Sequence, residues 1–77
     1  MIYDELGESS KSALVQLFYI NELERLAGSI DNFYKKQRAG IIAMMPKNTS
    51  IDILPNEIKN HISKRALHEY QLTKVRT

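Results

Sequence analysis

Apolar residues recur with helical spacing in the first third of the sequence. The densest run is ALVQLFYI, residues 13–20, in which only Gln16 is polar. A helix turns by about 100° per residue, so that five apolar side chains fall on one face of this segment. They are Tyr19, Ile20, Leu23, Leu26 and Ala27. The pattern predicts a helix from about Ser10 to Ala27, with Ser9 or Ser10 as the N-cap and Gly28 ending it.

A second helix is predicted to follow almost at once. Asp31 is a suitable N-cap for the segment NFYKKQRAG, and apolar residues continue to Pro46. Gln37 and Arg38 interrupt the apolar stripe, and Gly40 weakens a helix interior. Two interpretations of residues 41–45 therefore stand. We favour one continuous helix over a short strand after a break at Gly40.

The third helix has the most regular pattern. Pro55 suits the first helical position, where its missing N–H is no loss, and Leu54-Pro55 therefore marks the start. Ile58, Ile62, Ala66 and Tyr70 then recur every four residues. In the connector before it, residues 46–53, the isoleucines together with Leu54 are expected to contact the core. Residues 1–8 and 73–77 are expected to fray.

These elements predict an all-α fold over residues 1–77: a small three-helix bundle in which the first two helices form a hairpin. A domain of this size buries little apolar surface, and domains so small are commonly supported by disulfides, a metal or association. The chain has no cysteine. Good helix packing or a partner must therefore supply the support.

One group of side chains points to a partner. Leu14, Leu17 and Phe18 lie opposite Leu23 on the first predicted helix, in the i, i+3, i+4 arrangement of a helix anchor. Either other parts of this chain cover them, or they contact a second copy or another protein. Association is the more attractive alternative in a chain with so small a core. We therefore assign Leu14, Leu17 and Phe18 as the candidate protein contact.

Charge is unevenly distributed along the chain. Residues 1–34 carry six acids and two bases, a balance of −4, whereas residues 35–77 carry nine bases and three acids, a balance of +6. The two halves could attract each other, or the basic half could meet nucleic acid. For the second interpretation the candidate phosphate-binding residues are Lys35, Lys36, Arg38, Lys64 and Arg65. His61 and His68 lie on the same predicted face as the last two.

The sequence offers no constellation for catalysis or metal binding. His61 and His68 are seven residues apart, about 10 Å along a helix, too far to share one metal ion. There is no nucleophile elbow and no glycine-rich phosphate loop. The segment LERLAGSIDNFYKKQRAG resembles a repressor helix-turn-helix, but Ser29 and Gln37 stand where that motif has apolar residues. We predict neither an enzyme nor a protein with a cofactor or metal.

Residues 51–71 resemble the Leu-Pro helix of podovirus tubular tail proteins through Asp52, Leu54, Pro55, Ile62, Arg65, Ala66 and Tyr70. The same stretch is similar to the opening helix of F-box modules. Because two unrelated families match one amphipathic helix, we assign the chain to neither.

The function predicted from sequence is non-catalytic. We expect a small adaptor, regulator or assembly subunit that binds protein, either by self-association or within a larger complex. A basic helical nucleic-acid-binding protein is the alternative. Without a leader-like start or an apolar run of about 20 residues, the chain is expected to be intracellular, cytoplasmic and not membrane-bound.

Overall fold

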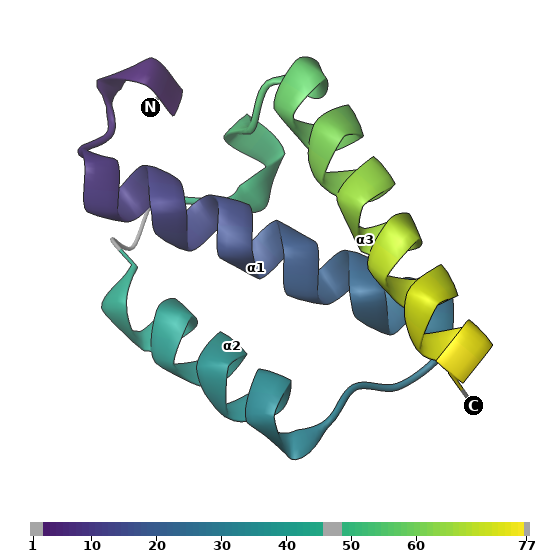
Figure 1. Ribbon diagram of the computed structural model, residues 1–77. Coiled ribbons are helices and arrows are strands. Elements are labelled where there is room, and N and C mark those ends of the chain that lie inside the picture. Colours follow the sequence, from purple (N-terminus) through teal and green to yellow (C-terminus); the bar gives the residue numbers. More distant parts are fainter. Residues whose placement is uncertain (1–2, 46–48, 77) are drawn as a thin grey trace.

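The computed structural model describes residues 3–45 and 49–76, with side-chain surroundings up to Leu72. A 3-10 turn, η1 (Tyr3–Glu5), precedes helix α1 (Glu8–Ala27). Helix α2 (Asn32–Met44), the 3-10 turn η2 (Ile51–Ile53) and helix α3 (Asn56–Arg76) follow (Figure 1). The described residues include no strand. The all-α, three-helix prediction is confirmed.

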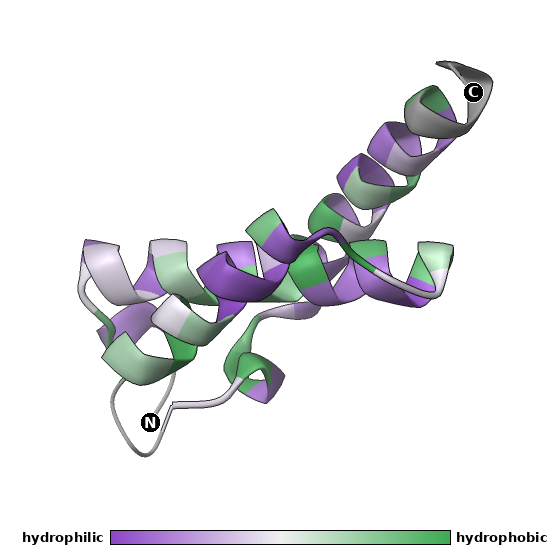
Figure 2. Ribbon diagram, turned by 90° about the horizontal axis from the view of Figure 1, so that it is seen from below, coloured by the Kyte–Doolittle hydropathy of each residue, from purple (hydrophilic) through white to green (hydrophobic). Residues whose placement is uncertain are grey.

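Helix α1 is the centre of the structure, because every extensive contact between elements involves it. It packs most widely against α3 and less widely against α2 and η2. The C-terminal part of α3 projects away from the layer formed by α1 and α2 (Figure 2). The radius of gyration of 13.0 Å exceeds the roughly 11.5 Å typical of a compact chain of this length. The fold is therefore less compact than is typical for a chain of this length.

The core is small, and the buried residues of α1 follow a stripe that winds around the helix. Leu14, Leu17, Ile20 and Leu23 are buried, each three residues after the last. Three residues turn a helix by about 300°, so each step moves the buried stripe by about 60°. From Leu14 to Leu23 the stripe rotates through about half a turn, which lets one helix serve neighbours on different sides. Leu54, Ile62 and Ala66 complete the buried set.

The predicted core faces are confirmed in part. Of the stripe predicted on α1, Ile20 and Leu23 are buried, Tyr19 and Leu26 are half-buried, and Ala27 is exposed. On α3 the four-residue repeat is confirmed, with Ile62 and Ala66 buried and both Ile58 and Tyr70 half-buried. Leu54 is buried too, and the isoleucines of η2 are half-buried, as expected for the connector.

Two helix starts differ from prediction. Helix α1 begins at Glu8, and its N-cap is Gly7, without a side-chain cap, rather than Ser9 or Ser10. Helix α3 begins at Asn56. Pro55 lies just before it and contributes its carbonyl, which accepts the Lys59 N–H at 3.0 Å, so that Pro55 is not the first helical residue.

The predicted glycine positions are confirmed. Gly28 ends α1 in the left-handed region at φ 82°, and its N–H donates to the Glu24 carbonyl at 2.7 Å. Helix α2 starts after Asp31 and runs without a break through Gly40 to Met44. The alternative of a strand over residues 41–45 is wrong, because i to i+4 bonding continues through the glycine.

The burial of Leu14 predicts a large loss of stability on truncation. Leu14→Ala should lower the free energy of unfolding by about 2–5 kcal/mol, a large share of what so small a domain has. Leu67→Ala, on the exposed side of α3, should cost under about 1 kcal/mol. Urea unfolding followed by circular dichroism measures both. Equal losses would show that Leu14 is not a core residue.

The two glycines predict opposite effects of alanine. Gly28→Ala should destabilise by about 1–2 kcal/mol, because a Cβ is unfavourable at this positive φ. Gly40→Ala should stabilise by up to about 1 kcal/mol, since Gly40 is inside a helix and a Cβ there meets nothing within 4 Å. Thermal melts of the two variants would test this. A stabilising Gly28→Ala would contradict the assigned turn.

A candidate binding groove between the second and third helices

The residues predicted as a protein contact lie mostly inside the fold. Leu14 is fully buried and Leu17 is 7% exposed, whereas Phe18 is half-buried. The sequence left open whether these side chains are covered by this chain or by another molecule. For Leu14 and Leu17, other residues of this chain provide the cover. Only Phe18 retains surface that another molecule could touch without disturbing the core.

Helix α2 is attached to α1 largely through polar contacts. All its residues are described, and none is buried. The Arg38 guanidinium donates to both carboxylate oxygens of Glu24, at 2.9 and 3.3 Å, and to Asn21 Oδ1 at 3.2 Å. Gln16 Nε2 donates to Gln37 Oε1 at 3.2 Å. These bonds, together with half-buried Tyr34 and Ile41, hold α2 against α1.

The ion pair also changes the acidity of Glu24. The hydrogen bond from Arg38 holds the pKa of the Glu24 carboxyl below its usual value. Arg38, one of the five candidate phosphate ligands, is thus engaged with α1. The other four, Lys35, Lys36, Lys64 and Arg65, are exposed. The structure places them on two helices that lie on different sides of α1, rather than in one cluster (Figure 1).

Large apolar side chains remain exposed on α2. Phe33 is 69% exposed, Ile42 58% and Met44 85%. Phe33 also packs edge-on against Tyr34, with ring centroids 5.5 Å apart. Phe33, Gln37, Gly40 and Met44 follow the 4, 3, 4 spacing of a single helical stripe. The stripe lies near the face of α1 that carries Gln16, because Gln37, a member of the stripe, accepts a hydrogen bond from Gln16.

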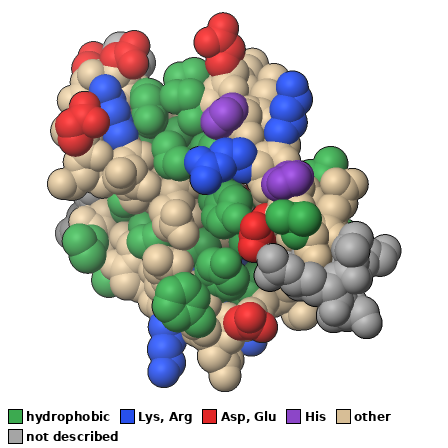
Figure 3. Space-filling model, in the orientation of Figure 1, with side chains coloured by type: hydrophobic (Ala, Val, Ile, Leu, Met, Phe, Trp, Pro, Cys, Tyr) green, Lys and Arg blue, Asp and Glu red, His purple; other side chains and the backbone are tan. Residues whose placement is uncertain are grey.

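A groove opens between α2 and α3, with α1 as its floor. Two adjoining hollows, of about 140 and 310 Å³, make up the groove. The floor residues share one α1 face at spacings of 3, 4 and 4: Gln16, Tyr19, Leu23 and Ala27. They span about 16 Å, three turns of helix. Figure 3 shows this side of the molecule, where hydrophobic side chains form a continuous band.

The walls of the groove differ in composition. Helix α3 contributes Ile62, Arg65, Glu69 and Tyr70, and Tyr34 stands at the start of α2. Tyr19 lies between the walls. Burial raises the pKa of its phenol, and the nearby Glu69 and Tyr34 raise it further. The groove is thus lined mainly by apolar and aromatic side chains, with Arg65 and Glu69 on its α3 side and Asp31 beside the start of α2.

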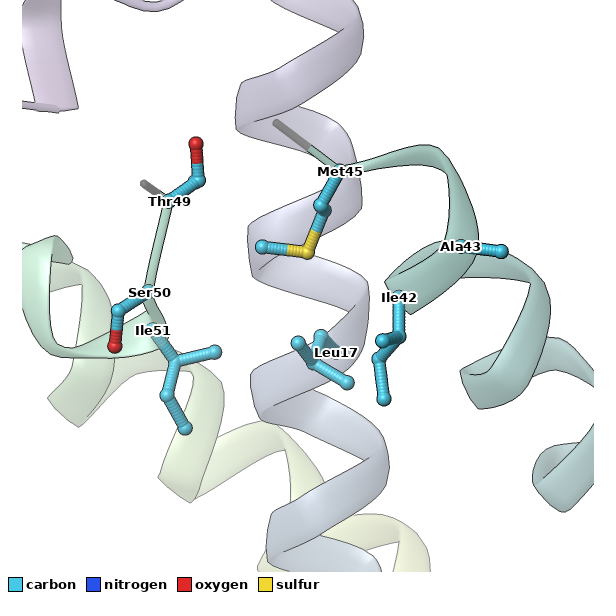
Figure 4. Close-up of a pocket in the computed structure, with 7 residues that line it drawn as sticks. All are labelled: Leu17, Ile42, Ala43, Met45, Thr49, Ser50 and Ile51. Atoms are coloured by element: carbon cyan, nitrogen blue, oxygen red, sulfur yellow. The ribbon is translucent and has the colours of Figure 1, made fainter. Parts of the chain in front are cut away.

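A third hollow lies apart from the groove, at the C-terminal end of α2. It has a volume of about 530 Å³ and is bounded by α1, α2 and the residues before η2. In Figure 4, Ile42 and Ile51 flank Leu17 from opposite sides, and Met45 lies above it. Thr49 Oγ1 is shielded from solvent and has no hydrogen-bond partner among the residues described.

Two kinds of site are not found in the described part of the chain. It contains no group of three or more His, Cys, Asp or Glu side chains that could hold a metal ion. None of its helices is both long enough and apolar enough to cross a bilayer.

Comparison with protein-family models, curated proteins and solved structures found no match to this sequence or fold.

Among the groove-lining residues, the sequence pointed only to Arg65, and to it as a phosphate ligand. The available signal was the interruption of the α2 stripe by Gln37 and Arg38, which are the residues that make polar contacts with α1. The half-buried side of α2 holds Tyr34, Arg38 and Ile41, and large apolar residues elsewhere on the helix stay exposed. Phe33 and Met44 are those residues.

The Glu24–Arg38 pair predicts acid-sensitive docking of α2. A lowered carboxyl pKa stabilises the folded state above the unfolded value of about 4.3, and this contribution disappears as the pH falls through the lowered folded pKa. NMR spectra of the wild type should therefore show α2 amide shifts changing between pH 6 and pH 3. In Glu24→Gln these shifts should already be displaced at pH 6 and change less on acidification.

Glu22→Gln is the matched control, since Glu22 pairs with Arg25 within α1 and does not hold α2. It should leave the acid response of α2 as in the wild type. Equal responses of α2 in the wild type and in Glu24→Gln would contradict the proposed role of the pair.

Proposed function

We propose that the protein is a non-catalytic interaction module, and that its groove receives a helical segment of another protein within a larger complex. One observation supports the proposal: the groove follows α1 and α3 for about three helical turns, and Tyr34 lines it at the start of α2. Phe33, next to Tyr34, and Met44 add exposed apolar surface on α2. In helix-in-groove recognition, the bound helix inserts apolar side chains spaced three or four residues apart.

The polar attachment of α2 supports the same function. A helix held largely by a few hydrogen bonds can adjust its position at small free-energy cost, because solvent-screened polar pairs contribute little to stability. A ligand that buries Phe33 and Met44 would add apolar contacts that α2 lacks in the free chain. Binding would thus stabilise the protein as well as select a partner.

Site-specific photo-crosslinking in the native host cell tests this function. A photoreactive phenylalanine analogue at position 33 should capture protein, because this position borders the groove. The same analogue in place of Lys35, which is exposed about 160° away from the stripe, should capture much less. If position 33 captured only nucleic acid, or no more protein than position 35, the proposal would be wrong.

A further inference from the structure

We infer that the larger hollow of the groove binds an arginine side chain of the partner's helical segment. The inference rests on the proposed function and specifies one residue of that partner. Two carboxylates carry it, because Asp31 at the start of α2 and Glu69 on α3 both line this hollow of about 310 Å³. The described residues that line it include no Lys, Arg or His, so their formal charge is −2.

The rest of the lining suits the stem and the flat head of an arginine. Leu23, Ala27 and Ile30 provide apolar contacts, which match the alkyl stem of a long basic side chain. Tyr34 and Tyr70 add two half-buried aromatic rings. A guanidinium group stacks on such rings and can form two parallel hydrogen bonds with a carboxylate. Arginine therefore suits this hollow better than lysine, whose ammonium is a compact point charge.

The two hollows of the groove differ in charge. Arg65 lines the smaller one, beside Gln16 and Tyr19, and it is not among the residues lining the larger one. Burial raises the pKa of the Tyr19 phenol most, Glu69 raises it next, and Arg65 lowers it with a smaller effect. The carboxylate thus outweighs the guanidinium even beside the hollow that Arg65 lines. Figure 3 shows acidic side chains next to the lower part of the hydrophobic band.

The carboxylate of Asp31 is not used by the helix that it precedes. An N-cap aspartate commonly accepts a hydrogen bond from a backbone N–H of the first turn. Asp31 is the N-cap of α2, yet its side chain makes no capping hydrogen bond, and the residue is exposed. Its oxygens are therefore accessible to a ligand. Asparagine is an equally good N-cap, so Asp31→Asn removes the charge and keeps a residue suited to this position.

The position of the hollow places the arginine near one end of the ligand helix. Leu23 and Ala27 belong to the larger hollow, and Gln16 and Tyr19 to the smaller one, so the carboxylates stand at the end of the floor nearest the C-terminus of α1. The floor spans 11 residue steps, about 16 Å. A ligand helix of the same length would carry apolar side chains at i, i+3 and i+7 and its arginine at i+11, all on one face.

Three synthetic helical peptides test the inference. All carry leucines at i, i+3 and i+7, and they differ only at i+11, which is arginine, citrulline or glutamate. Citrulline is an uncharged isostere of arginine, so this pair isolates the charge. Fluorescence anisotropy with the full chain should show the arginine peptide binding about tenfold more tightly than the citrulline peptide, and the glutamate peptide binding most weakly. The advantage of arginine should decrease as salt is raised.

Charge-neutralising variants locate the contact. Asp31→Asn and Glu69→Gln should each reduce the preference for arginine over citrulline about threefold, and should change binding of the citrulline peptide less than about twofold. Glu57→Gln is the matched control, because Glu57 is exposed on the same helix, about 18 Å from Glu69 along its axis, and does not line the groove. It should leave the preference unchanged. Equal losses in Glu57→Gln and Glu69→Gln would indicate nonspecific attraction and overturn the inference.

The remaining outcomes separate this inference from the proposed function. If the three peptides bound equally, or none bound, while position 33 still captured protein in cells, the arginine inference would fail and the interaction module would stand. Tightest binding of the glutamate peptide would overturn the inference in favour of an acidic partner. Sedimentation showing a stable homodimer that excludes the arginine peptide would overturn it in favour of a second copy.

Discussion

The whole arrangement depends on the winding of the buried stripe along α1. Residues spaced by three move steadily around a helix, so that Leu14 and Leu23 face different sides although both are buried. One helix can then contact η2, α2 and α3 in turn. The same geometry limits how much apolar surface each neighbour receives. Helix α3 takes the largest share, and α2 is left to attach through side chains that hydrogen-bond.

Charge follows a similar division of roles. The acidic first half of the chain supplies Glu24, and the basic second half supplies Arg38, so the two halves do attract each other at this point. The remaining exposed cations of α2 and α3 lie outside that pair. The charge asymmetry of the sequence thus has two parts: an ion pair that attaches α2 to α1, and exposed bases on the outer surfaces of α2 and α3.

Much of the fold could be predicted from sequence because it rests on local signals. Gly28, Asp31 and the four-residue repeat from Ile58 correctly indicated how the helices end, begin and face the core. The triplet at Leu14, Leu17 and Phe18 could not be interpreted the same way. A single-face analysis assumes that one helix buries one stripe, and a stripe that winds by about 60° per step looks like two apolar sides. The groove depends on how three helices diverge, and no local pattern records that angle.

Because α2 buries none of its residues, close packing constrains its amino-acid sequence less than it constrains a core helix. Core positions accept few substitutions, since each change in volume disturbs close-packed neighbours. On α2 that constraint is replaced by a short set of polar partners around Arg38 and Gln37. Positions such as Phe33 and Met44 can therefore vary over generations without loss of the fold. Substitutions on the exposed face of α2 would leave the α1–α3 core intact, so this surface can change while the fold is kept.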